Sequence, residues 1–182
     1  MRITPPDAFL RQPWRNGGGT THEIAREEDA AGLLWRLSVA EVGSAGPFSA
    51  FPGLDRILTV IAGAGLILDT PEGRLHAMPF VPLGFRGDLP VDCRLIDGAV
   101  RDFNVIHDPG RIRAAVTVVR PGATLACPAG PGRHYAVLAT GPGTRLDGVT
   151  LPAGALARFD AAGRLTGAEA PALLVTIGAV AA

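Results

Sequence analysis

The chain has 182 residues, of which 17 are Lys or Arg and 17 are Asp or Glu, so its formal net charge at pH 7 is zero. A chain of this length can bury one sizeable core or two small ones. A neutral chain has no electrostatic attraction to nucleic acid or to an anionic membrane, so we expect a small molecule as its partner. All 17 basic residues are Arg, which excludes a Lys Schiff base or a Lys general base.

The cysteines and the apolar segments indicate the compartment. Cys93 and Cys127 are too few for a disulfide framework or a four-cysteine zinc site. The start of the chain lacks a charged segment followed by an apolar one, and no stretch of about 18 apolar residues occurs. We therefore expect a cytoplasmic protein that does not enter the membrane.

The first predicted element is a short helix within "TPPDAFLR", residues 4–11. Thr4 can act as the N-cap, Pro5 suits the first helical position, and Asp7 suits the capping-box position. The next segment, "PWRNGGGTTHEI" at residues 13–24, contains three consecutive glycines. Such a run suits a backbone that bends sharply or approaches another group closely. It is not a P-loop, because the Gly-Lys-Ser/Thr ending is absent.

Strand patterns dominate the rest of the chain. In residues 34–40, Arg36 and Ser38 alternate with three large apolar residues, so the two polar side chains share one face. Residues 56–68 predict a strand, a Gly-Ala-Gly turn and a returning strand. Later apolar runs, separated by Gly and Pro, are spaced as in a sandwich or barrel: residues 114–119, 134–140 and 172–180.

The two halves of the chain are similar to each other. Residues 59–66 resemble residues 136–146, and each segment is followed by a Pro-x-Gly sequence. We predict an all-β protein with a short N-terminal helix and two small barrels, one formed by residues 1–106 and the other by residues 107–182.

Five segments of the first half, taken in order, carry a family resemblance: "PWRNGGGTTHEI", "WRLSVAEV", "GPFSAFPGLDRIL", "LGFRGDLPVDCRLIDG" and "VRDFNV". Together they resemble the HutD/Ves family of bicupins, whose two barrels are RmlC-like jelly rolls. The second half matches only in its general barrel character. The resemblance implies a cytoplasmic protein associated with histidine utilisation in bacteria, which senses a metabolite such as urocanate or N-formylglutamate. It implies no established catalytic activity.

The positions of metal ligands in cupins can be tested on this sequence. Metal-binding cupins generally place a His-x-His and then a Glu before the first glycine turn, and another His after the Pro-x-Gly sequence. Counting from Gly63, these positions fall on Ser49, Phe51 and Arg56, with the last near Gly87. None of these residues suits a first-row metal, and a guanidinium repels cations. The four histidines are scattered singly, at His22, His76, His107 and His134. We therefore expect no metal and no other cofactor.

An arginine on the barrel wall changes what the barrel can bind. The planar guanidinium of Arg56 suits a carboxylate, so the barrel interior becomes a candidate anion site. The alternative is a surface arginine paired with Asp55 or Asp88. Position in the sequence does not decide between these two, and the family resemblance favours the pocket.

The glycine loop is a second candidate part of the site. If this segment crosses the barrel mouth, the amides of Gly17 and Gly18 could face an anion, as in a backbone nest. Asn16, Thr20 and Glu23 would then add directional hydrogen bonds. The predicted ligand-binding set also includes side chains from the strands: Arg36, Ser49, Phe51, Arg56, Asp102 and Asn104. The alternatives are a tight surface turn for the loop, a solvent-facing Arg36, and hydrogen bonds from Asp102 and Asn104 to nearby loops.

Three functions remain open from the sequence. The leading hypothesis is a metal-free protein that binds a small carboxylated metabolite and modulates histidine utilisation or a related stress response. The second is a metal-independent isomerase, epimerase or hydrolase that uses Glu23 or a nearby His as general base. The third is a structural module that forms a homodimer. No catalytic residue is assigned.

Overall fold

The structure, a computed structural model, describes residues 1–167 and 169–180. Within these residues the chain forms nineteen β-strands and one 3-10 turn, Pro6–Ala8, so the predicted all-β class is confirmed. In the same residues no helix has the length and apolar character that crossing a membrane requires.

The predicted N-terminal helix is wrong, because the structure has only the 3-10 turn η1 (Pro6–Ala8) at this point. Thr4 ends strand β1 (Arg2–Thr4), and no side chain caps the turn. Pro5 is extended, with φ −75° and ψ 161°. The cause is local, since the ring of Pro6 clashes with a helical conformation of the residue before it. Phe9 is extended as well, so the turn does not continue.

The described chain forms two compact units. The first contains residues 10–111, and the second contains residues 1–9 together with the chain from residue 112 onward. The first nine residues belong to the second unit because β1 pairs antiparallel with β17 (Leu156–Phe159), with Ile3 opposite Ala157. The sequence-based division at residue 106 differs here, since it groups these residues with the first barrel.

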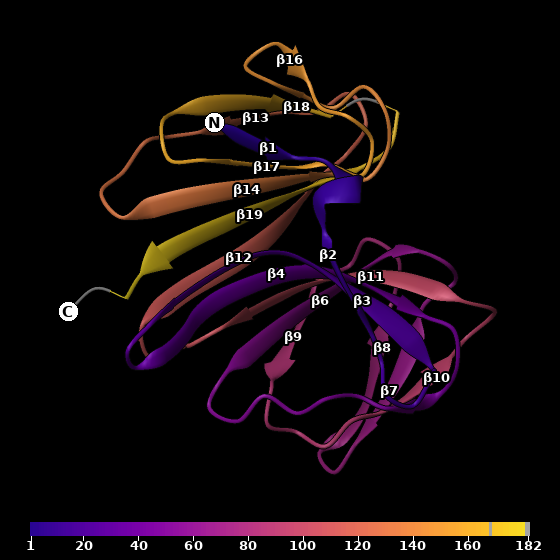
Figure 1. Ribbon diagram of the computed structural model, residues 1–182. Helices are drawn as coiled ribbons and strands as arrows, with labels where there is room; N and C mark the ends of the chain where they lie inside the picture. The colour runs from indigo at the N-terminus through magenta and orange to yellow at the C-terminus, as the bar shows by residue number, and fades with distance from the viewer. Residues whose placement is uncertain (168, 181–182) are drawn as a thin grey trace. The chain divides into compact units, whose positions relative to one another are not determined.

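The first unit consists of two antiparallel sheets (Figure 1). Its strands are β2 (Leu10–Pro13), β3 (Gly19–Asp29), β4 (Gly32–Val42), β5 (Gly46–Pro47), β6 (Asp55–Ala62), β7 (Leu66–Thr70), β8 (Gly73–Ala77), β9 (Leu83–Arg86), β10 (Asp92–Leu95) and β11 (Val100–His107). The six-stranded sheet has the order β2-β3-β4-β11-β6-β9, and the four-stranded sheet has the order β5-β10-β7-β8.

The core of the first unit joins residues of both sheets. Leu58 and Val60 of β6 and Leu66 and Leu68 of β7 are fully buried in one apolar cluster. Strands β6 and β7 do not pair with each other: β6 pairs with β9 and β11, whereas β7 pairs with β8 and β10. The predicted glycine turn therefore exists, but it carries the chain from one sheet to the other instead of closing a hairpin.

The glycine triple closes the tight loop that leads into β3. The amide of Gly17 donates to the carbonyl oxygen of Trp14 at 3.1 Å, and the amide of Gly18 donates to Asn16 Oδ1 at 3.0 Å. Gly17 has a φ of +72°, which favours glycine. Gly19 has a different reason, since a Cβ there would lie 2.4 Å from the carbonyl oxygen of Glu41. The loop thus needs glycine for its own backbone packing.

We expect Gly19→Ala to lower the free energy of unfolding by about 1–3 kcal/mol, because the added methyl group forces the packed backbone apart. Gly17→Ala should cost about 1–2 kcal/mol, because only the left-handed backbone opposes it and the space beside Gly17 is open. Urea unfolding of both variants measures the difference. A Gly19→Ala protein as stable as wild type would contradict this account of the loop.

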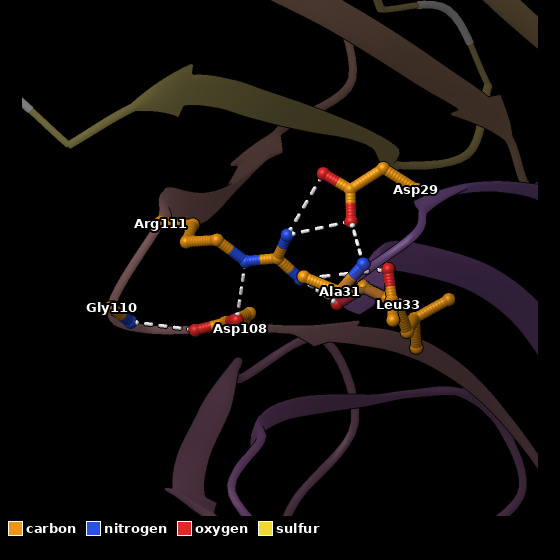
Figure 2. A network of polar contacts seen from close by, with 7 residues as sticks. Asp29, Ala31, Leu33, Asp108, Gly110 and Arg111 are labelled. Carbon is orange, nitrogen blue, oxygen red and sulfur yellow. Dashed lines mark hydrogen bonds and ion pairs between the residues drawn. The ribbon is translucent and has the colours of Figure 1, made fainter.

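Arg111, the last residue of the first unit, is the centre of a network of polar contacts (Figure 2). Its Nε donates to Asp108 Oδ2 at 2.6 Å, and its Nη1 donates to both carboxylate oxygens of Asp29 at 2.9 and 3.0 Å. Its Nη2 donates to the carbonyl oxygen of Leu33 at 3.1 Å. These hydrogen bonds hold the pKa of both carboxyls below the ordinary value. The turn between β3 and β4 is thereby tied to the segment that follows β11.

The second unit also has two antiparallel sheets (Figure 1). Its further strands are β12 (Ile112–Val119), β13 (Thr124–Cys127), β14 (Arg133–Ala139), β15 (Arg145–Leu146), β16 (Val149–Thr150), β18 (Gly163–Thr166) and β19 (Ala172–Ala179). The sheet orders are β1-β17-β14-β19-β12 and β13-β18-β15-β16. In its core, the rings of Tyr135 and Phe159 stack 5.1 Å apart, and the Tyr135 hydroxyl donates to the Pro128 carbonyl oxygen at 2.9 Å.

Candidate functional site

The first unit contains a cavity of about 500 Å³. The residues that line it come from β2 and the glycine loop, from β3, β4, β6 and β11, and from β5 and the segment after it: Gln12, Pro13, Trp14, Arg15, Asn16, Thr21, Arg36, Ser38, Ala40, Pro47, Phe48, Ser49, Phe51, Arg56, Asn104 and Ile106. Its charged members are Arg15, Arg36 and Arg56, and this set of described residues contains no Asp, Glu, His or Cys. The lining is therefore cationic.

Strand alternation and register explain how polar side chains reach this interior. On β4, Arg36 and Ser38 line the cavity, whereas Leu37 between them lies on the opposite face of the sheet. Across the sheet, Ile106 of β11 lies opposite both Arg36 of β4 and Arg56 of β6. The two arginines therefore flank one apolar residue on the same face.

Arg56 is a buried arginine, with a relative exposure of 7%. Its guanidinium carbon lies 4.6 Å from the ring centre of Phe48 and 5.6 Å from that of Phe85. Burial lowers the pKa of the guanidinium, and the charge of Asp102 opposes this shift. Because an arginine stays protonated in proteins, the cavity keeps a positive charge next to two aromatic rings.

The hydrogen bonds of Arg56 are incomplete. Its Nε donates to Asn104 Oδ1 at 2.8 Å, and Asn104 Nδ2 donates to Asp102 Oδ1 at 2.5 Å. Among the described residues, neither Nη1 nor Nη2 of Arg56 has an acceptor or an ion-pair partner. An anion in the cavity could accept from both groups, since the guanidinium offers two parallel donors.

Asp102 lies behind Asn104 and is fully buried. Burial raises the pKa of this carboxyl from 3.8 to about 6, and Arg56 and Asn104 partly oppose the shift. Its Oδ2 has no hydrogen-bond partner among the described residues. The carboxylate is thus kept in the interior with half of its acceptor capacity unused.

The other two arginines of the lining differ in their pairing. Arg36 Nε donates to Glu23 Oε2 at 2.6 Å, and Arg36 Nη2 donates to Gln12 Oε1 at 3.0 Å, so the Arg36 charge is neutralised. Arg15 is exposed and has no ion pair or hydrogen bond of its side chain within the described residues. Of the three arginines in the lining, Arg56 is therefore the one that is buried without a direct ion pair.

Aromatic side chains give the cavity an apolar wall. Trp14 meets Phe48 edge to face, with ring centres 6.1 Å apart. The indole Nε1 of Trp14 donates to Thr21 Oγ1 at 2.8 Å, which fixes the ring. Phe51 lies in the same lining. Such a wall suits the hydrocarbon or planar part of a small acid.

The structure brings six of the eleven sequence-predicted binding residues to the cavity: Asn16, Arg36, Ser49, Phe51, Arg56 and Asn104. Glu23 and Asp102 do not belong to its lining, but each hydrogen bonds to a residue that does. Gly17, Gly18 and Thr20 lie elsewhere, in a second hollow that Glu41 and Arg101 also line.

The expected backbone nest differs from the loop that the structure shows. The amides of Gly17 and Gly18 donate to Trp14 and Asn16 inside the loop, so they are not available to an anion in the cavity. The loop contributes side chains instead, from Trp14, Arg15 and Asn16.

Ten lining residues are not in the sequence-predicted set, among them Gln12, Arg15, Thr21 and Phe48. Thr21 could have been found, because it alternates with Glu23 along β3 and shares its face. Arg15 carries no periodic signal, since its position depends on the loop conformation. Gln12 lies on the short strand β2, directly opposite Thr21 of β3.

The donor chemistry of the cavity does not fit a metal ion. Residues 1–167 and 169–180 contain no group of three or more His, Cys, Asp or Glu side chains that could hold one. The expected ligand positions carry Ser49, Phe51 and the guanidinium of Arg56, which itself occupies the interior. The chemistry of the site therefore depends on the guanidinium of Arg56 and not on a metal ligand set.

Comparison with known proteins places this geometry in a family. The family model described as HutD matches residues 7–175. An uncharacterized 21.2 kDa protein in the hutC 3' region of Pseudomonas putida is 46% identical over 118 residues, which span 63% of this chain and 62% of that protein. HutD from Pseudomonas fluorescens SBW25 (formate condition) matches with a TM-score of 0.87 at 32% identity over 99% of both chains.

A more distant structure agrees in fold. A cupin 2 conserved barrel domain protein from Leptotrichia buccalis matches with a TM-score of 0.55 at 12% identity, over 89% of each chain. The predicted bicupin architecture and the predicted family are thus confirmed. The chain belongs to the HutD family of histidine-utilisation-associated cupins.

Proposed function

We propose that the first barrel binds a small carboxylated metabolite and that the protein acts by this binding, without catalysis, to modulate histidine utilisation or a related stress response. The observation that supports this most strongly is the buried Arg56, whose Nη1 and Nη2 have no acceptor among the described residues. Arg56 lines the cavity, so an anion there could accept from both charged donors in a two-point geometry.

The size and the wall of the cavity suit a metabolite larger than a simple inorganic ion. Its volume of about 500 Å³ lies within the range of small-molecule sites. The aromatic wall of Trp14, Phe48 and Phe51 can cover an apolar or planar body. A urocanate-like acid or an N-formylglutamate-like acid has this combination, and the P. putida relative is described by its place in the hutC 3' region.

The enzymatic alternative has less support. A general acid and base working together need titratable groups that converge on one cavity. Glu23, the candidate base, does not line the cavity. Its Oε2 accepts a hydrogen bond from Arg36 Nε at 2.6 Å. His22 lies next to it in sequence, and its Nε2 is 3.7 Å from Glu41 Oε1, a residue of the second hollow.

Calorimetric titration tests the proposal. We expect urocanate or N-formylglutamate to bind saturably and the uncharged amide of the same acid to bind far more weakly, because the amide cannot pair with a guanidinium charge. Equal binding of acid and amide, or no binding of either acid at millimolar concentration, would contradict the proposal. A cytoplasmic location and a homodimer stay predictions.

A further inference from the structure

We propose that Asp102 is a positioning residue of this site: it orients the amide of Asn104, which in turn holds the guanidinium of Arg56 with both Nη groups presented to the cavity. The inference rests on the proposed function, in which Arg56 binds the carboxylate. It adds a residue that does not touch the ligand.

The side chain of Asn104 ends in an amide that has two possible orientations. The amide of Asn104 can present either its oxygen or its nitrogen to a neighbour. Arg56 Nε can only donate, and an ionised Asp102 can only accept. With one on each side, a single orientation satisfies both neighbours, and it is the one observed, with distances of 2.8 Å to Arg56 Nε and 2.5 Å to Asp102 Oδ1.

The guanidinium of Arg56 is held by its Nε hydrogen bond and by contacts with two aromatic rings. The Nε hydrogen bond fixes one edge of its plane, and the rings of Phe48 and Phe85 lie near its face. The remaining edge carries Nη1 and Nη2, which have no acceptor in the described part of the chain. A carboxylate needs this edge free and correctly oriented for two parallel hydrogen bonds.

Asp102 is not placed as a direct counter-ion of Arg56. Arg56 and Asp102 form no direct ion pair among the described residues, and the contact between them runs through Asn104. The carboxylate also keeps Oδ2 buried and unpartnered. A buried counter-ion would be better placed against the guanidinium, whereas a positioning residue needs only its acceptor on Asn104 Nδ2.

The ionisation of Asp102 can be followed without interference from its neighbours. The titratable groups that act on it are Arg56 on β6 and, on β10, the thiol of Cys93, whose pKa burial raises to about 12. Neither changes its charge between mildly acidic and neutral pH, whereas burial sets the pKa of Asp102 at about 6.

A double-mutant cycle on carboxylate binding is the first test. We expect Asp102→Ala and Asn104→Ala each to weaken binding of N-formylglutamate or urocanate by roughly tenfold, and the double variant to bind no more weakly than the Asn104 variant. Asp102→Asn should retain most of the affinity, because its amide oxygen can still accept from Asn104 Nδ2. Additive losses in the double variant would overturn the positioning role.

A second test needs no ligand, so it separates failure of this inference from failure of the proposed function. In protein with isotope-labelled arginine, the Arg56 Nε–H signal is assigned by its loss in Arg56→Lys. We expect this signal to exchange slowly with water, and its shift to titrate with a midpoint near the Asp102 pKa of about 6. The titration should vanish in Asp102→Asn, and fast exchange should appear in Asp102→Ala.

The matched control is Asp92→Asn, which removes an exposed carboxylate from β10, a strand of the other sheet. It should leave the Nε–H signal and its titration unchanged. An Arg56 signal that stays protected and titrates equally in Asp102→Ala would overturn the inference, even if wild type binds carboxylates. If wild type binds none, the proposed function fails, and the signal still decides whether Asp102 orients Arg56.

Discussion

Replacing Arg56 by Ala should weaken the binding of a urocanate-like or N-formylglutamate-like acid by about ten- to a hundredfold. The estimate follows from a charge-assisted hydrogen bond, which contributes roughly 1.5–3 kcal/mol. Arg56→Lys should recover only part of the loss, because an ammonium keeps the charge but cannot make two parallel hydrogen bonds or pack flat against Phe48.

The Ala variant needs a control for folding, since it removes the positive charge near the buried Asp102. The double variant Arg56→Ala/Asp102→Asn removes both charges and should fold while binding as weakly as Arg56→Ala. Arg74→Ala is the matched control, because Arg74 is exposed and pairs with Asp69 outside the cavity. Equal affinities of wild type, Arg56→Ala and Arg56→Lys in calorimetric titration would remove Arg56 from the site.

Asp102→Asn should raise the free energy of unfolding at neutral pH, by up to about 3 kcal/mol. The folded pKa of about 6 exceeds the ordinary value of 3.8, so the ionised carboxylate destabilises the folded protein. A difference of roughly 2 pKa units corresponds to about 3 kcal/mol. The cost is present in full above the folded pKa and disappears as the pH falls toward the unfolded one. The stabilisation by Asn should therefore shrink on acidification.

Urea unfolding of wild type and Asp102→Asn at neutral and mildly acidic pH measures this effect. The pH must stay well above the range in which Asp69 is protonated, because the pKa of that carboxyl is lowered to about 2 and its contribution is lost as the pH falls. Asp97→Asn, in the exposed turn after β10, should change stability little at either pH. An Asp102→Asn protein less stable than wild type at neutral pH would contradict the expectation.

These two results together would show that the buried carboxylate of Asp102 lowers the stability of the folded protein and is retained for binding. A buried carboxylate that lowers stability is expected where the site needs it. In this protein the need is the orientation of Asn104 and Arg56, as the hydrogen bonds indicate. Asp102→Asn should therefore raise the free energy of unfolding, and any change that it makes in carboxylate affinity should be a loss.

The strand pattern predicted much of the barrel and part of its interior. The alternation in residues 34–40 puts Arg36 and Ser38 on one face, and both line the cavity because side chains alternate along any strand. The resemblance singled out Arg56, and its surface alternative is excluded by its burial. Alternation also put Asp102 and Asn104 on one face, but it could not tell that only Asn104 reaches the cavity.

Contacts between distant segments could not be predicted in this way. The pairing of β1 with β17 joins residues 2–4 to residues 156–158, and no local pattern in residues 2–4 indicates this partner. The glycine triple correctly signalled a close approach, but the approaching group is the Glu41 carbonyl oxygen and not a ligand. A sequence shows that space is needed at such a position and leaves open what fills it.

A crystal structure of the protein with urocanate or N-formylglutamate bound tests the central claim most directly. We expect the carboxylate oxygens to lie about 2.7–3.2 Å from Nη1 and Nη2 of Arg56, with the rest of the ligand against Phe48 and Trp14. A carboxylate bound in the hollow beside Gly18, or anywhere that leaves the Nη groups of Arg56 without the ligand, would contradict the claim.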